Sequence, residues 1–385
     1  MTTGVVSLTS DLKRKKWMRE GLVQAASRSF WSPLTGSTKD SVVFQANNEN
    51  SSAGHTVVFD FDGNLSGKAV KGKETAFGKG EQKKKFSDKI TVERYRLVVD
   101  NGDKFDGVDI GDLTINEHSD SRQKLGDLFI RFKDQALFDA AQGTVATLND
   151  GIQTPSHVID LGTTFNFASL LDIEKTLKTS NGFTTGDVRR PLQPYRLDNG
   201  EPVWLFVVDA AMANLLRTDT SGYQTIVRSG DVRGANNRNI SGIIGKLGTL
   251  LIVEADQFFG YTSGSTSGWG LNDSEVEMCG LRQYDGASPG SALWTGQEGF
   301  DYASTSLHSR GLILGAGGLQ TAFGKQPDYK YQESTDFGIK SESAVEFWME
   351  ARKANLTAEN EQYRAAKISD LDYGVVAVDV QVQTA

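Results

Sequence analysis

The clearest helical pattern in the chain lies in its first half. Apolar residues recur at intervals of three or four positions from Leu125 through Leu128, Phe129 and Phe132 to Ala140. This spacing places apolar side chains on one face of an α-helix. The sequence therefore predicts a long amphipathic helix over roughly 119–142, with Phe129 and Phe132 facing the core.

Two strand-like runs precede this helix. They are HTVVFDFD (55–62) and KITVERYRLVVD (89–100), and a segment rich in glycine and lysine separates them. This arrangement predicts a long β-hairpin over 55–100. The segment between the runs has few core-forming side chains, so we expect it to project outward. Because an isolated two-stranded ribbon is barely stable in water, we expect a neighbouring subunit to support it.

The first 54 residues have the pattern of an arm. A helix is predicted from Asp11 to Phe30, where basic and apolar positions alternate. Residues 32–54 are polar, with one short apolar run at 42–44. We therefore expect residues 1–45 to serve assembly rather than the core of their own subunit.

Short helices and strands alternate after Gly143. Helices are predicted at 167–179, from Asp209 through Leu216 and near Gln224–Arg228, and strands around 192–198 and at 203–208, 247–256 and 372–382. An apolar run at 311–317 and an alternating segment at 341–351 precede the last strand. Together with the hairpin and the long helix, this order indicates an α+β fold class.

Composition excludes several classes of protein. The 385 residues include 49 acidic and 41 basic side chains, for a net charge of −8, which argues against a dedicated nucleic-acid binder. The single Cys279 cannot form an internal disulfide, and the four histidines lack metal-ligand spacing, so we expect no metal and no cofactor. No run approaches the roughly 18 apolar residues of a membrane span, and the N-terminus lacks a signal core. We therefore expect a soluble protein made in the cytoplasm, without membrane contact.

An acidic run follows the hairpin. Aspartates stand three positions apart at 100, 103, 106, 109 and 112. A solvated loop is the favoured interpretation, and a divalent-cation site is the alternative.

One motif suggests enzymatic chemistry. Gly286 to Gly290 match the G-x-S-x-G nucleophile elbow around Ser288, and Asp301 and His308 follow in the order of α/β-hydrolases. The flanking residues are neither a buried strand nor a helix, and the three candidates span only about 20 residues. We expect no enzyme activity and no catalytic residue, with a soluble hydrolase using Ser288 as an alternative.

Six segments follow one another in a distinctive order. They are DFDGNLSGKAV (60–70), KLGDLFIRFKDQALFDAAQG (124–143), VWLFVVDAAMANLLRTD (203–219), LGTLLIVEADQF (247–258), ILGAGGLQTAFGKQPDYKYQESTDFGIK (313–340) and DYGVVAVD (372–379). This ordered set resembles the major capsid proteins of tailed double-stranded DNA phages, and most closely the schitovirus-like branch.

The resemblance implies a tailed-phage major capsid fold. Its expected parts are an N-terminal arm (1–54), an extended β-hairpin loop (55–100), a peripheral domain with a spine helix (101–198), an axial domain (199–305) and C-terminal strands of the peripheral domain (306–385). Many copies would form pentamers and hexamers of an icosahedral shell in the virion. The shell would enclose DNA without sequence-specific binding, with portal, scaffolding and decoration proteins as further partners. A tail protein is another alternative.

Residues of the hairpin and the arm are the candidates for contacts between subunits. They are Lys68, Lys71, Lys73, Phe77, Lys79, Lys83, Lys84 and Lys85 of the hairpin and Trp17 and Trp31 of the arm. We expect the lysines to act by electrostatic docking on an acidic neighbour.

Overall fold

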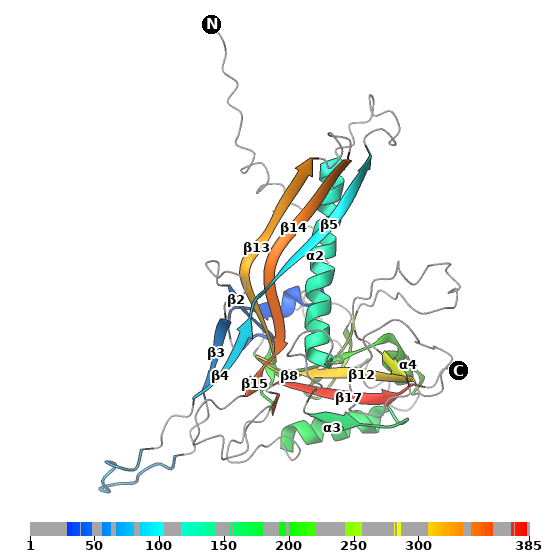
Figure 1. Ribbon diagram of the computed structural model, residues 1–385. Helices are drawn as coiled ribbons and strands as arrows, with labels where there is room; N and C mark the ends of the chain where they lie inside the picture. Colours follow the sequence, from blue (N-terminus) through cyan, green and yellow to red (C-terminus); the bar gives the residue numbers. More distant parts are fainter. Residues whose placement is uncertain are drawn as a thin grey trace.

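The computed structural model (Figure 1) describes the folded framework of the chain. The described residues are 29–38, 40–47, 56–62, 67–80, 85–103, 117–143, 155, 157–179, 192–197, 200–219, 243–255, 281, 283–285, 307–333, 340–356, 371–372 and 374–382. The predicted helix near Gln224–Arg228, nearly all of the one from Asp11 to Phe30, and most of the acidic run lie outside these residues.

A long sheet forms the upper part of the molecule in Figure 1. Among the described residues it has five strands in the order β1-β2-β13-β14-β5. Their bounds are Thr35–Gly36 (β1), Val43–Asn47 (β2), Leu319–Glu333 (β13), Lys340–Lys353 (β14) and Glu93–Asp103 (β5). β14 pairs antiparallel with both β13 and β5, whereas β2 pairs parallel with β13.

Helix α2 (Glu117–Gln142) runs along one face of this sheet, which confirms the predicted long helix. The period-two alternation of β14 explains the contact, because Val345, Phe347 and Met349 are buried on the helix side. Phe129 meets Phe347 edge to face, with ring centroids 4.7 Å apart. Phe129 is buried as predicted, whereas Phe132 is only partly buried against the same cluster.

A second sheet lies across the lower end of α2 (Figure 1). Its described strands follow the order β6-β17-β12-β8-β10-β9, with β11 beside β12 and β7 beside β8. Their bounds are Val158–Asp160 (β6), Tyr195–Arg196 (β7), Pro202–Val208 (β8), Ile243–Leu247 (β9), Leu250–Glu254 (β10), Gln283–Asp285 (β11), Leu307–Leu314 (β12) and Val375–Gln381 (β17). These strands confirm the predictions at 203–208, 247–256 and 372–382.

Both faces of this second sheet are buried, which explains its nearly continuous apolar runs. One face packs against α3 (Phe167–Thr179) and α4 (Ala210–Thr218). Helix α4 begins at its predicted cap, since the Asp209 carboxylate accepts a hydrogen bond of 2.8 Å from the Met212 N–H. The other face packs against the C-terminal end of α2 through Leu137 and Phe138.

A fully buried ion pair joins the second sheet to the long helix. Arg310 of β12 donates from Nε and Nη2 to the Asp379 carboxylate of β17, at 2.7 and 2.9 Å. Arg310 also donates to the carbonyl oxygen of Gln142, the last residue of α2, at 3.1 Å. Because this bidentate geometry fixes three elements at once, the pair sets where the helix ends on the sheet.

The hairpin is confirmed but shorter than predicted. β3 (Thr56–Asp62) pairs antiparallel with β4 (Lys85–Thr91). The second predicted run is divided, because the chain leaves β4 at Val92 and continues as β5 in the five-stranded sheet. A further short ladder joins β15 (Asn355–Leu356) to β16 (Leu371–Asp372).

The described strands do not divide at the predicted domain boundaries. Segment 306–385 supplies β13 and β14 to the long sheet but β12 and β17 to the second sheet. The second sheet also takes β6 from segment 101–198 and β8 to β10 from segment 199–305. The assignment of peripheral and axial domains stays a prediction, with β12 and β17 belonging to the same sheet as the axial segment.

Candidate assembly surfaces

The tip of the hairpin, residues 67–80, presents charged and aromatic side chains to solvent. In Figure 1 it lies beyond β3 and β4, away from both sheets. Phe77 is 94% exposed, and the tip lysines at 68, 71, 73 and 79 are exposed as well. An aromatic ring this exposed leaves its apolar surface in water, so Phe77 is available for contact with another chain.

Local interactions shape the tip. The Lys79 amide donates to the Ala76 carbonyl at 3.2 Å, and the Lys79 ammonium contacts the Glu74 carboxylate at 2.9 Å. Gly72 and Gly78 adopt positive φ angles of 68° and 81°, which residues with a Cβ rarely adopt. The tip is therefore a series of turns with polar and apolar side chains directed outward.

The base of the hairpin is fixed to its own subunit. Phe59 and Ile90 are buried against β2 and β13, and the Phe59 ring meets Phe44 edge to face at 5.3 Å. Arg352 of β14 donates to the Lys89 carbonyl at 3.1 Å and lies 3.9 Å from the Asp88 carboxylate. The subunit thus anchors the base and leaves the tip available to a neighbour.

The remaining hairpin candidates are less defined. Lys85 is the first residue of β4, but its side chain is not among those described, and Lys83, Lys84 and Trp17 lie outside the described residues. Their role in contacts between subunits stays a prediction.

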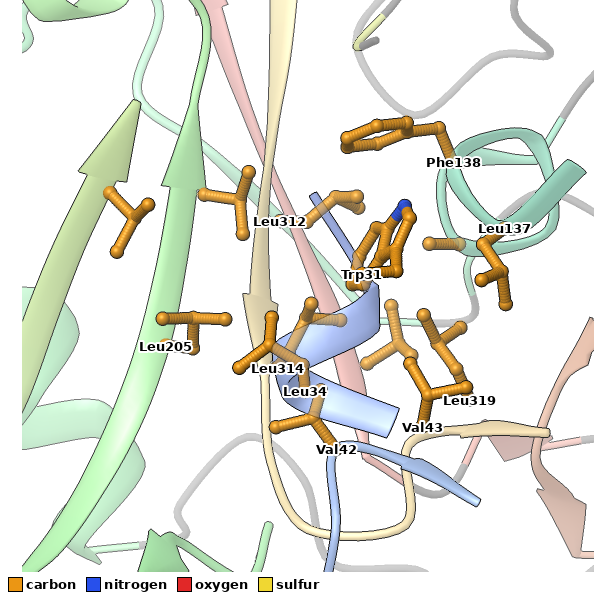
Figure 2. Close-up of a cluster of buried hydrophobic side chains, with 14 of the residues drawn as sticks. Trp31, Leu34, Val42, Val43, Leu137, Phe138, Leu205, Leu312, Leu314 and Leu319 are labelled. Carbon is orange, nitrogen blue, oxygen red and sulfur yellow. The ribbon is translucent and has the colours of Figure 1, made fainter. Parts of the chain in front are cut away.

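Trp31 corrects the assembly prediction for the arm. Its side chain is fully buried in its own subunit, where Figure 2 shows it between Phe138 of α2 and β12. Leu34, Val42 and Val43 are buried in the same cluster. Val43 and Phe44 of the apolar run at 42–44 belong to β2, which pairs with β13, so this part of the arm contributes to the core of its own subunit. The local sequence does not reveal that these side chains are buried, because the residues they pack against are about 100 and 280 positions away.

A buried carboxylate anchors the start of this segment. Asp134 of α2 accepts hydrogen bonds from the Ser29 hydroxyl at 2.6 Å and from the Phe30 amide at 2.8 Å. Burial raises the pKa of Asp134, although these hydrogen bonds and Lys133 oppose the shift. Burial likewise lowers the pKa of neighbouring Lys133.

A second charged site lies on the face of the long sheet opposite α2, and sequence reasoning missed it. Glu346 of β14 is 2% exposed and lies among four basic side chains. Arg94 and Arg96 of β5 contact its Oε1, and Lys325 and Lys330 of β13 contact its Oε2; the longer contacts are 3.7 Å from Arg96 and 3.8 Å from Lys325. We call these four side chains and Glu346 the basic cluster. The alternation of SESAVEFWMEA places Glu346 away from the helix, but only strand pairing reveals its partners.

The basic cluster has a positive local field. Desolvation, Lys325 and then the two arginines lower the pKa of Lys330, while Asp328 opposes them. Lys325 also lies 5.9 Å from the centre of the Trp348 ring. A positive surface beside an aromatic ring is therefore available on this face.

The residues of the candidate hydrolase site are only partly described. His308 lies on β12, opposite Tyr284 and Gln381, and is 8% exposed. Ser288 and Asp301 are outside the described residues. Among the described residues, no three His, Cys, Asp or Glu side chains form a group that would hold a metal ion. No described helix combines the length and apolarity needed to cross a bilayer.

Comparisons with known proteins give a partial family match and a consistent fold. Residues 5–169, which are 165 of 385, match the model of a family described as phage capsid protein. No curated protein sequence matches the chain.

Three solved structures match it over nearly their whole length. The capsid of Ralstonia phage GP4 has a TM-score of 0.65 at 16% identity and covers 100% of this chain and 99% of its own. The head structure of Helicobacter pylori bacteriophage KHP40 has a TM-score of 0.64 at 14% identity and covers 100% and 95%. The Cyanophage Pam1 capsid asymmetric unit has a TM-score of 0.58 at 14% identity and covers 100% of both chains. The chain therefore has the fold of phage capsid subunits, as the resemblance implied.

Proposed function

We propose that this chain is the major capsid protein of a tailed double-stranded DNA phage. Many copies form pentamers and hexamers that close into an icosahedral head. The observation that carries this proposal is the extent of the fold match, because the whole chain corresponds to whole capsid chains and not to one shared domain. The match of residues 5–169 to a phage capsid family supports it independently.

The hairpin gives the subunit a way to hold its neighbours. Its base is fixed by Phe59 and Ile90, whereas its tip exposes Phe77 to solvent. Burying this ring on another subunit would remove apolar surface from water, and the tip lysines would add electrostatic docking. Lys68, Lys71, Lys73 and Lys79 are the candidates with described surroundings, and Trp31 is withdrawn because its own subunit buries it.

Several finer expectations belong to the same proposal. The order of sequence blocks supports the schitovirus-like branch. The subunit would be made in the host cytoplasm and would enclose DNA in the virion, with portal, scaffolding and decoration proteins as further partners. The net charge of −8 suits a wall that does not bind packaged DNA. The shell would have a structural role without catalysis.

Electron microscopy of the purified, expressed protein tests the proposal. We expect closed, roughly isometric shells built from rings of five and six subunits. Tubes or isolated rings would favour a tail protein instead. A monomer that hydrolyses a generic ester, and loses that activity in Ser288→Ala, would favour the hydrolase alternative.

A further inference from the structure

The basic cluster has a surplus of positive charge in an acidic protein. Arg94, Arg96, Lys325 and Lys330 contribute four positive charges and Glu346 contributes one negative charge. Asp328, which lies 3.3 Å from Lys325, adds a second negative charge, so a surplus of two remains. The chain as a whole carries −8. The net charge of the chain is therefore opposite in sign to that of the cluster.

Glu346 holds the cations in place without removing them from solvent. The carboxylate is 2% exposed, whereas Arg94, Arg96 and Lys330 keep 43%, 58% and 49% of their side-chain surface exposed. A guanidinium has five N–H donors, so one contact to Glu346 leaves donors for a second carboxylate. Because the buried carboxylate fixes the side chains beforehand, a partner would order them at a lower entropic cost.

Two apolar side chains border the cluster. Val98 of β5 lies two residues beyond Arg96 on the same face and is 55% exposed. Trp348 lies in register with Arg94 and is partly buried. Arginine and tryptophan are enriched in the energetically important centres of interfaces. Helix α2 covers the opposite face of the sheet, and the exposed fractions show that the described residues leave this face open.

We propose that this face of the long sheet docks acidic side chains of a second copy of the chain. The inference rests on the proposed function and specifies one of its contacts. A second copy is the occupant that charge complementarity favours, because each copy carries 49 acidic against 41 basic side chains. In a shell every subunit also meets other copies at high local concentration.

Assembly of a charge-reduced variant tests this docking. Arg94→Gln with Arg96→Gln removes two positive charges but leaves Lys325 and Lys330 to pair with Glu346. Lys175→Gln with Arg196→Gln is the matched control, since both residues are exposed elsewhere and the change in net charge is the same. Light scattering at low salt should show assembly at least about tenfold slower for the cluster variant than for the control. The difference should shrink as NaCl is added.

Cross-linking identifies the partner. A zero-length carbodiimide joins lysine amines to carboxylates with loss of water and forms an amide. In shells assembled from mixed ¹⁴N and ¹⁵N subunits, we expect mixed-isotope pairs that join Lys325 or Lys330 to an aspartate or glutamate.

The outcomes separate this inference from the proposed function. If wild-type protein forms shells and the cluster variant assembles like its control, with Lys325 and Lys330 linked only within one chain, the docking inference is refuted and the capsid proposal stands. A variant that assembles normally but binds a DNA duplex less tightly would instead assign the face to nucleic acid. If the wild-type protein forms no shells, both proposals are wrong.

Discussion

The hydroxyl of Ser29 donates a 2.6 Å hydrogen bond to the carboxylate of Asp134, 105 positions later in the chain. This bond fastens the first described residue to the long helix, and the Phe30 amide shares the same carboxylate. The position brings Trp31 against Phe138, with ring centroids 4.8 Å apart. Ser29, Phe30 and Trp31, which precede the hairpin, are therefore a structural part of the subunit.

Trp31→Ala should destabilise the isolated subunit. The side chain is fully buried, so its truncation leaves a large cavity and should lower the free energy of unfolding by about 3–5 kcal/mol. Urea denaturation of unassembled subunits measures this. Deletion of residues 1–28 is the control, because it removes none of the described core contacts and should leave stability nearly unchanged while impairing shell formation. Equal stability of Trp31→Ala and wild type would place the side chain outside the core.

Phe129→Ala and Phe132→Ala should lower the free energy of unfolding by different amounts. Phe129 is buried among the strands, so its truncation should cost about 3–5 kcal/mol. Phe132 is only partly buried and contacts Tyr95 and Phe347, so its truncation should lower the free energy of unfolding by about 1–3 kcal/mol. Denaturation midpoints of the two variants give the comparison. A larger loss for Phe132 would contradict the orientation of the helix.

Glu350 should make subunit stability depend on pH. Burial raises the pKa of its carboxyl from 4.5 to about 7, and nearby Glu93 adds to the shift. The folded state therefore binds the proton more tightly than the unfolded state, so this contribution to stability is complete below about pH 4.5 and is lost as the pH rises through 7.

Glu350→Gln should remove this dependence, because glutamine stays neutral. The variant should be about 1–3 kcal/mol more stable than wild type at pH 8 and nearly equal to it at pH 4.5. Thermal unfolding of unassembled subunits across this range measures the difference, in which the titration of all other groups cancels. A difference that does not change with pH would show that folding leaves the pKa of Glu350 unshifted.

Phe77→Ala should affect assembly and spare the subunit. The ring is 94% exposed, so its removal should change subunit stability by no more than about 0.5 kcal/mol. Loss of the ring should nevertheless reduce the yield of shells. Phe59→Ala is the contrasting variant, because it removes a buried ring at the hairpin base and should destabilise the subunit itself. Normal shells from Phe77→Ala would exclude the tip ring from the contact.

The sequence by itself determined the elements whose pattern is local. Helical spacing from Leu125 to Ala140 located α2, Asp209 marked the start of α4, and two β-like runs located the hairpin. These signals are visible because each depends on side chains a few positions apart, where the backbone period fixes which of them share a face.

Only the tertiary structure decided which side chains from distant segments contact one another. Trp31 is buried because α2 and β12 come together around it, and Glu346 is neutralised because β5 and β13 lie on either side of β14. Strand pairing also places β12 and β17 in the second sheet, and the pairing of β3 with β4 ends at Thr91. Pairing between distant segments depends on the packing of the whole chain, so local periodicity predicts the strands but not their neighbours.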